Sequence, residues 1–231
     1  MTKVVDEKKL IIALDFDEKS DVLSLCNELD PKTCRVKIGK QLFTKYGPSI
    51  IDDVHNLDFE VFLDLKFHDI PTTVKKACIE AYKQKIWMLN IHLLGGIEMV
   101  QAAKEARDIH SPNSKLIGVT LLTSHKINDF QTFGLSERTN IVSQLTQIAI
   151  EANIDGIVCS PSDIPNLNIK NEEFMKVTPG IRLENTSHDH ASIFTPSKAV
   201  ELGSTHLVVG RPITESESPK AIVEEINSSI I

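Results

Sequence analysis

The residues with the clearest potential for chemistry lie in the stretch Val61–Pro71, VFLDLKFHDIP. Asp64 and Lys66 stand two positions apart after an apolar beginning, so in a β-strand both side chains point to the same side. Asp69 follows where the strand is expected to end. Charged groups inside a protein are very unfavourable unless they are paired. The stretch therefore predicts either a salt-bridge network that only fixes the end of a strand, or a functional site.

Lys66 is the residue of this stretch that can deliver a proton. The neighbouring carboxylates of Asp64 and Asp69 favour its charged ammonium form, whereas a Schiff-base lysine must become a neutral amine. An ammonium group suits a general acid that protonates a carbanion and stabilises its charge. Lys37, on the preceding predicted strand, adds a second cation, so the expected array holds two lysines and two aspartates.

Two later stretches indicate a phosphate site. Val208–Pro212, VVGRP, places Gly210 and Arg211 at the end of a strand, and Thr178–Arg182, TPGIR, adds a second turn that ends in an arginine. Glycine permits close approach to the backbone, and arginine offers a bidentate fork to phosphate. Barrels often bind phosphate in their last two strand-to-helix loops. A plain turn with a surface arginine is the alternative at both positions.

The histidines give weaker indications. His188 and His190 form a His-x-His pair around Asp189, but no carboxylate or cysteine pattern accompanies them as in a structural zinc site. His68 fits the role of a hydrogen-bonding loop residue better than that of a base. His92, at the end of an apolar strand, fits a satisfied polar group as well as a ligand. We therefore predict no metal site.

The elements that must position these residues alternate between strand and helix about every 25–30 residues. The predicted strands are Leu10–Asp15, Arg35–Gly39, 60–66, Met88–His92, Lys115–Leu121, Gly156–Cys159, Phe174–Thr178 and His206–Val209. The predicted helices are Lys19–Leu29, Pro48–Asn56, Thr72–Gln84, Ile97–Ile109, Arg138–Asn153, Pro161–Asn168, Pro196–Leu202 and Pro219–Ser228. Polar residues gather at the carboxyl ends of these strands, which predicts an α/β fold, a (β/α)8 TIM barrel. A doubly wound open sheet is the alternative, although its GxGxxG fingerprint is absent.

The bulk composition fits this expectation. The 231 residues are 41% hydrophobic, and we expect one domain over 1–231 because no linker or low-complexity segment divides the chain. The net charge of −7 argues against general binding to nucleic acid or to acidic membranes. The first residues, MTKVVDEKK, lack the apolar segment of a signal peptide. Four scattered cysteines, without a CxxC pair, indicate reduced thiols and a cytoplasmic protein.

The stretch Asp64–Pro71, DLKFHDIP, resembles the DxKxxD signature of the orotidine 5'-phosphate decarboxylase family. Further matches run in the family's order along nearly the whole chain. They are Ala13–Asp15, Lys37–Gly39, Val119–Ser124, Thr178–Arg182 and Val209–Thr214. The DxKxxD signature alone is shared with related sugar-phosphate decarboxylases and aldolases of the same barrel group, whereas the combined set is highly specific.

The resemblance implies a homodimeric barrel with its sites at the dimer interface. It implies decarboxylation of orotidine 5'-phosphate to UMP, the last step of de novo pyrimidine synthesis, without a metal or an organic cofactor. By position, Lys66 would protonate the carbanion at C6 of the pyrimidine, with Asp64, Asp69 and Lys37 completing the charged network. The resemblance also implies that Asp15 and Lys37 contact the ribose and that Thr123 contacts the pyrimidine. Asp69 and Thr73 would reach into the partner's site. The residues on the phosphate side would be Arg182, Gly210 and Arg211.

One position departs from the family's pattern. The family has a glutamine in the loop after the seventh strand, a few residues before a Thr-Pro pair, and counting back from Thr195–Pro196 gives His190. Glutamine bridges phosphate and pyrimidine as a neutral donor and acceptor. Histidine can donate to phosphate, but its charge changes near about pH 6.5. We expect His190 to clamp the phosphate in a pH-dependent way, while a loop alignment shifted by one residue would make it a bystander.

Two other functions compete with this one. Metal-dependent relatives, 3-keto-gulonate-phosphate decarboxylase and hexulose-phosphate synthase, carry an acidic metal ligand on the second strand, where this chain has Lys37. That lysine disfavours a divalent cation. A non-catalytic phosphate-binding barrel would keep Gly210 and Arg211 but would have no need of the four charged residues around Lys66.

Overall fold

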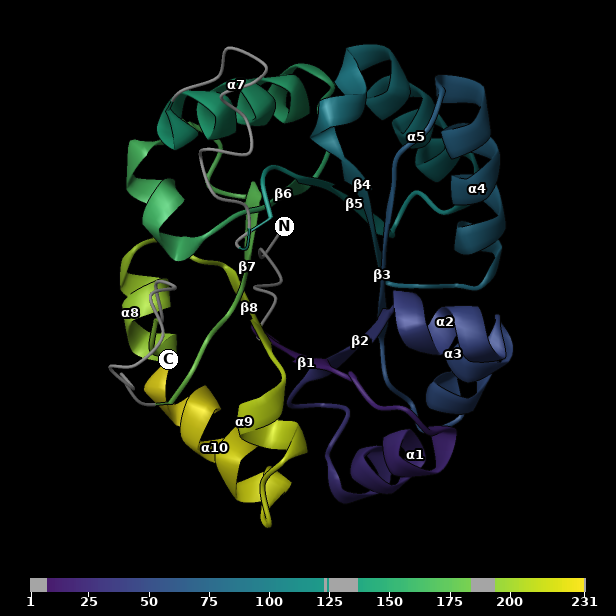
Figure 1. The fold of residues 1–231 in the computed structure, drawn as a ribbon, viewed down its shortest axis with the longest axis vertical. Helices are drawn as coiled ribbons and strands as arrows, with labels where there is room; N and C mark the ends of the chain where they lie inside the picture. The colour runs from purple at the N-terminus through teal and green to yellow at the C-terminus, as the bar shows by residue number, and fades with distance from the viewer. Residues whose placement is uncertain (1–7, 123, 125–136, 184–193, 231) are drawn as a thin grey trace, which may run out of the picture.

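The computed structural model describes residues 8–122, 124, 137–183 and 194–230. Within them, parallel strands β1 to β8 form a closed barrel in chain order, because β1 pairs with both β2 and β8 (Figure 1). The strands are Leu10–Ala13 (β1), Arg35–Gly39 (β2), Val61–Phe67 (β3), Met88–His92 (β4), Lys115–Val119 (β5), Gly156–Val158 (β6), Met175–Pro179 (β7) and His206–Val209 (β8). The predicted (β/α)8 barrel is therefore confirmed, and the open doubly wound sheet is excluded.

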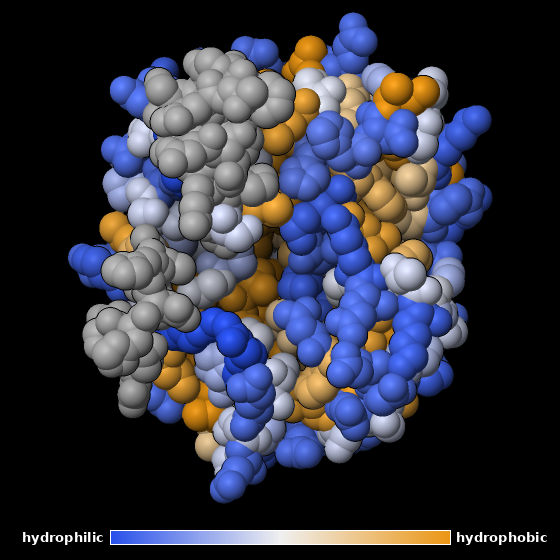
Figure 2. Space-filling model, viewed as in Figure 1, coloured by the Kyte–Doolittle hydropathy of each residue, from blue (hydrophilic) through white to orange (hydrophobic). Residues whose placement is uncertain are grey.

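Helices surround the barrel, and their outer faces carry many hydrophilic residues (Figures 1 and 2). The α-helices are Lys19–Glu28 (α1), Lys40–Tyr46 (α2), Ser49–His55 (α3), Pro71–Lys83 (α4), Gly96–His110 (α5), Arg138–Glu151 (α7), Pro196–Glu201 (α8), Arg211–Thr214 (α9) and Pro219–Ser229 (α10). The 3-10 helices are Leu93–Gly95 (η1) and Pro161–Asn166 (η2). In the described part of the chain, no helix has the length and apolar character that crossing a membrane requires.

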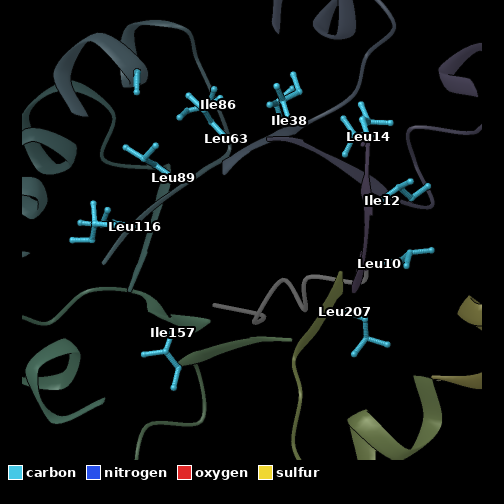
Figure 3. Close-up of a cluster of buried hydrophobic side chains, with 14 of the residues drawn as sticks. Leu10, Ile12, Leu14, Ile38, Leu63, Ile86, Leu89, Leu116, Ile157 and Leu207 are labelled. Atoms are coloured by element: carbon cyan, nitrogen blue, oxygen red, sulfur yellow. The ribbon is translucent and has the colours of Figure 1, made fainter. Parts of the chain in front are cut away.

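Alternation along the strands divides the buried residues into two clusters. On β1, Leu10 and Ile12 belong to the cluster between the barrel and its helices, whereas Ile11 and Ala13 belong to a smaller cluster that also contains Phe62. Figure 3 shows labelled members of the first cluster pointing away from the barrel. The second cluster therefore fills the interior, and side chains in the same alternation at the carboxyl ends of the strands face the mouth of the barrel.

The strand register places polar side chains in this mouth. Lys37 pairs with Ala13 of β1, and Asn90 pairs with Ile117 of β5, so both share the inward alternation. Asp64 lies two residues beyond the interior residue Phe62 and has the same alternation. Three neighbouring strands thus each direct one polar side chain into the same end of the barrel.

Candidate active site

A cavity of about 460 Å³ lies at the carboxyl ends of the strands. Its polar lining comes mainly from β1 to β4 and the residues that follow them, and its apolar lining comes mainly from β5 to β8 and the residues that follow them. The lining residues are Asp15, Lys37, Gly39, Lys40, Phe62, Asp64, Lys66, Asn90, Val119, Leu121, Leu122, Ser124, Val158, Cys159, Pro179 and Val208. Figure 2 shows hydrophobic residues inside a hollow near the centre of the drawn face, beside hydrophilic ones. The cavity can hold a molecule with an apolar ring and charged substituents.

A larger and more open hollow, of about 710 Å³, lies at the other end of the barrel. Glu60, Trp87 and Ser114, which precede β3, β4 and β5, are among the residues that line it. In (β/α)8 enzymes the chemistry is at the carboxyl ends of the strands, whereas the amino-terminal face serves stability. We therefore assign the smaller cavity as the candidate active site.

Lys37, Asp64 and Lys66 form one charged cluster in this cavity. The Nζ atom of Lys37 lies 3.2 Å from Oδ2 of Asp64 and 3.4 Å from Oδ1 of Asp15. The Nζ atom of Lys66 forms an ion pair with the other oxygen of Asp64. Lys37 and Asp64 are buried. The buried charges of Lys37 and Asp64 are therefore paired before a ligand is present, as burial requires, and the exposed Asp15 adds a second carboxylate.

The two lysines keep the Asp64 carboxylate ionised. Burial alone raises the pKa of Asp64. The charges of Lys37 and Lys66, together with hydrogen bonds from Lys66 and Asn90, lower the pKa by more than burial raises it, so the pKa lies below the ordinary value of 3.8. An aspartate with a lowered pKa holds its negative charge throughout the neutral range. Asp64 can therefore fix both ammonium groups and present a permanent negative charge to a ligand.

The strand β3 bulges where Lys66 stands. Leu63 pairs with Leu89 and Phe67 with Ile91, so the three residues from Asp64 to Lys66 lie opposite Asn90 alone. Lys66 has φ 53°, a left-handed conformation that costs a non-glycine residue about 1–2 kcal/mol. The sequence predicts a regular strand here, and the structure differs. Backbone strain of this kind is concentrated at functional sites.

Asn90 is a site residue that the sequence analysis does not predict. Its Nδ2 donates to Oδ1 of Asp64 at 2.6 Å, and its Oδ1 accepts from the backbone N–H of Lys66 at 2.8 Å. A signal was present in MLNIH, where a buried amide interrupts an apolar strand at an inward position. Asparagine is uncharged, however, so the pattern of charges at the strand ends does not include it.

The opposite wall of the cavity is apolar. Phe62, Val119, Leu121, Val158 and Cys159 line it, and all except the half-buried Val158 are buried. Burial raises the pKa of the Cys159 thiol well above its usual value, so this cysteine acts as a small apolar group rather than as a thiolate. This wall suits the face of an uncharged ring next to the charged cluster.

Asp69 and Thr73, which the sequence predicts as site residues, stand apart from this cavity. Both are exposed, and neither lines the cavity. Oδ1 of Asp69 accepts from the backbone N–H of Ile70 at 2.6 Å, just before α4 begins at Pro71. Within one chain, Lys37, Asp64 and Lys66 therefore lie together, whereas Asp69 is exposed in the segment between β3 and α4.

The predicted phosphate-side residues follow β7 and β8. Gly210 precedes α9, and a Cβ atom at this position would lie 3.6 Å from Cβ of Ala13 and 3.8 Å from Oδ2 of Asp15. Arg211, the first residue of α9, is exposed. Arg182 is half-buried, and its backbone N–H donates to the carbonyl of Phe194 at 3.0 Å. These residues occupy the part of the barrel where phosphate sites commonly form.

Two predicted site residues, Thr123 and His190, lie outside the described residues. Within the described ranges, no group of three or more His, Cys, Asp or Glu side chains is arranged to hold a metal ion.

Comparisons with known proteins identify relatives that match nearly the whole chain. Residues 8–226 match the family described as "Orotidine 5'-phosphate decarboxylase / HUMPS family". The chain is 42% identical over 231 residues to the orotidine 5'-phosphate decarboxylase of Vibrio cholerae serotype O1, a match that covers 98% of this chain and all of the relative. It is 43% identical over 225 residues to the enzyme of that name from Saccharophagus degradans, with 96% of this chain and 94% of the relative covered.

A solved structure gives the same result. The crystal structure of orotidine 5'-phosphate decarboxylase from Lactobacillus acidophilus superimposes with a TM-score of 0.85 at 34% sequence identity, covering 96% of this chain and 99% of that one. With its barrel, its charged cluster and these matches over nearly its full length, the chain belongs to the orotidine 5'-phosphate decarboxylase / HUMPS family.

Proposed function

We propose that this chain decarboxylates orotidine 5'-phosphate to UMP and CO2, the last step of de novo pyrimidine synthesis. The observation that carries the proposal is the ion-paired cluster of Lys37, Asp64 and Lys66 next to an apolar wall in a cavity of about 460 Å³. Relatives 42% identical over nearly the full chain bear the name of this activity. The cavity offers a hydrophobic surface to the pyrimidine and a cation to the carbon that loses CO2.

In the proposed reaction, the bond between C6 of the pyrimidine and its carboxylate breaks, and the electron pair stays on C6 as CO2 leaves. The Lys66 ammonium stabilises this charge and then gives a proton to C6, which forms the C6–H bond of UMP. The neutral amine regains a proton from solvent. The Asp64 carboxylate repels the substrate carboxylate, and this repulsion is relieved when CO2 departs. The chemistry requires neither a metal nor an organic cofactor.

The ribose and phosphate occupy the remaining sides of the site in this proposal. Asp15, 3.4 Å from the Lys37 ammonium, shares the ribose hydroxyls with that lysine. Arg182, Gly210 and Arg211 bind the phosphate, whose binding energy is used at the distant reacting carbon. Thr123 contacts the pyrimidine, and His190 serves as the phosphate clamp; both assignments rest on the family's pattern.

The proposal includes a homodimer in which Asp69 and Thr73 of each chain complete the partner's site. Asp69, just before α4, and Thr73, in its first turn, are both exposed and do not line the cavity of their own chain, which supports this arrangement. Ile70 is 64% exposed and Leu94 is 44% exposed, and they follow the adjacent strands β3 and β4. Large apolar side chains exposed together are typical of an interface.

The metal-dependent chemistry of relatives in the same family is the competing function. Those enzymes carry an acidic metal ligand on the second strand, whereas here the Lys37 ammonium lies 3.2 Å from Asp64. A divalent cation bound to Asp64 would meet this positive charge. An absorbance assay for the loss of orotidine 5'-phosphate in excess EDTA separates the two. Full activity in the chelator supports the proposal, and a preparation that is inactive with and without added Mg²⁺ contradicts it.

In this proposal the reaction takes place in the cytoplasm. Residues 1–231 form the one domain that carries it out. The four cysteines, Cys26, Cys34, Cys78 and Cys159, are free and buried, which fits a reducing compartment.

A further inference from the structure

Asn90 lies between two residues of the proposed reaction and is 1% exposed. Its amide nitrogen donates to Asp64, and its amide oxygen accepts from the backbone N–H of Lys66. The backbone N–H of Lys66 can only donate, and the ionised carboxylate of Asp64 can only accept. These two partners therefore fix which end of the amide faces which residue. A residue that is only a donor, or only an acceptor, cannot replace it.

The hydrogen bond from the backbone N–H of Lys66 to Asn90 replaces a strand-to-strand hydrogen bond that the bulge interrupts. Because Asn90 alone stands opposite three residues of β3, the regular ladder between β3 and β4 is interrupted there. The side chain of Asn90 takes the place of a ladder carbonyl for the N–H of Lys66. Without such a partner, a buried N–H group is costly, and the left-handed backbone of Lys66 loses a contact that holds it.

We propose that Asn90 is a positioning residue for the decarboxylation, which fixes the Asp64 carboxylate and holds the Lys66 backbone in the conformation that presents its ammonium group to the cavity. The inference rests on the proposed function and extends it by one residue. Asn90 acts through Asp64 and Lys66, so its loss changes the rate of the chemical step more than the binding of phosphate at the far side of the site.

The first test is Asn90→Leu, which keeps the number and branching of the side-chain heavy atoms and removes both hydrogen bonds. We expect kcat to fall about 100-fold, because a misplacement of about 1 Å at a reacting group has this effect. We expect KM to change by less than about threefold. Ser114→Ala is the matched control, since Ser114 is also buried and donates to a backbone carbonyl, that of Ile86, at the opposite end of the barrel. Its kcat should equal that of the wild type.

The second test is Asn90→Asp, which separates positioning from packing. The ionised form of the new carboxyl group accepts from Lys66 but cannot donate to Asp64, and it repels that carboxylate. Burial and the charge of Asp64 raise the pKa of the new group, and the Lys37 and Lys66 ammonium groups, which also contact Asp64, act against this rise. The protonated form of the new group has one donor and one acceptor, as asparagine has. We expect the kcat of this variant, relative to wild type, to rise as the pH falls from about 8 to about 5.

The outcomes are distinguishable from those for the proposed function. Wild-type kcat in Asn90→Leu, or a pH profile of Asn90→Asp parallel to that of the wild type, overturns the inference while the wild type remains an active decarboxylase. An inactive wild type refutes the proposed function, and a crystal structure of Asn90→Leu then decides the positioning. We expect displaced Asp64 and Lys66 side chains and a changed φ at Lys66; unchanged positions overturn the inference.

Discussion

Lys37 and Asp64 meet across the pair of strands β2 and β3, with Nζ of the lysine 3.2 Å from Oδ2 of the aspartate. Gly39 pairs with Asp64 and Lys37 pairs with Phe62, so the contact is diagonal. Because Lys37 takes one carboxylate oxygen, the other is left for Lys66. The strand register therefore determines which lysine contacts which oxygen of Asp64, before any substrate binds.

Replacing Lys66 by alanine tests its role as proton donor. We expect Lys66→Ala to lower kcat by about 1,000-fold or more, because both proton delivery and charge stabilisation are lost. Asp64 keeps its ion pair with Lys37, so the barrel should stay folded by circular dichroism. Lys85→Ala is the control, since Lys85 is also a lysine with a left-handed backbone, φ 56°, but lies outside the cavity. Near-wild-type turnover in Lys66→Ala would remove the proposed mechanism.

Much of the fold could be predicted because each barrel strand is a short apolar run between polar segments. The helix α2 was missed because it follows β2 directly and buries only Leu42, so its sequence has no clear periodicity. The first strand was predicted through Asp15, whereas β1 ends at Ala13 and leaves that carboxylate free to reach Lys37.

The charged part of the site could be predicted for a different reason. Charges at the ends of apolar strands are costly, so Lys37, Asp64 and Lys66 were visible from residue type alone. The bulge at Lys66 and the partners of the Asn90 side chain could not be predicted, because both depend on how β3 and β4 pair. Such pairings are tertiary, and local sequence does not determine them.

Replacing Arg211 by alanine tests the phosphate side. Arg211→Ala should raise KM for orotidine 5'-phosphate by about 10- to 100-fold, because this factor corresponds to the binding free energy that one hydrogen bond to a charged group contributes. With orotidine, which lacks the phosphate, wild type and variant should give the same rate. Lys220→Ala, which removes an exposed cation from α10, serves as the control. Equal KM values for wild type and Arg211→Ala would show that the arginine does not contact phosphate.

Acid titration tests the ion pairs of Asp64. A carboxyl group whose pKa is lower in the folded protein stabilises the fold above its unfolded pKa, and this contribution is lost as the pH falls through the folded pKa. The pKa of Asp64 lies below 3.8, so the Tm difference between wild type and Asp64→Asn should be full above about pH 4 and should narrow below it. Asp58→Asn, at an exposed position, is the control. A constant difference down to about pH 2.5 would contradict the pairing.

His190 tests the departure from the family's pattern. If a histidine clamps the phosphate, its charged form donates to phosphate more strongly, so KM of the wild type should rise as the pH increases through about 6.5. Glutamine has no charge to lose, so His190→Gln should flatten this rise. Steady-state kinetics from about pH 5.5 to about pH 8 measure both profiles. Identical profiles would make His190 a bystander, and His188→Gln is the neighbouring control.

Ile70 tests the proposed dimer. This residue is 64% exposed between Asp69 and α4, and in the proposed homodimer it lies against the partner. Burying an unpaired carboxylate at an interface is costly, so Ile70→Asp should sediment as a monomer under conditions in which the wild type sediments as a dimer. Its activity should fall with dissociation, because Asp69 and Thr73 no longer reach the partner's site.

Ile109→Asp is the matched control for this substitution, since Ile109 is 63% exposed at the end of α5 and belongs to no proposed interface. It should keep the wild-type sedimentation coefficient and kcat. A fully active monomer of Ile70→Asp would show that one chain completes its own site. The exposed position of Asp69 would then require another explanation, because in the single chain its carboxylate accepts from the backbone of Ile70 rather than contacting Lys66.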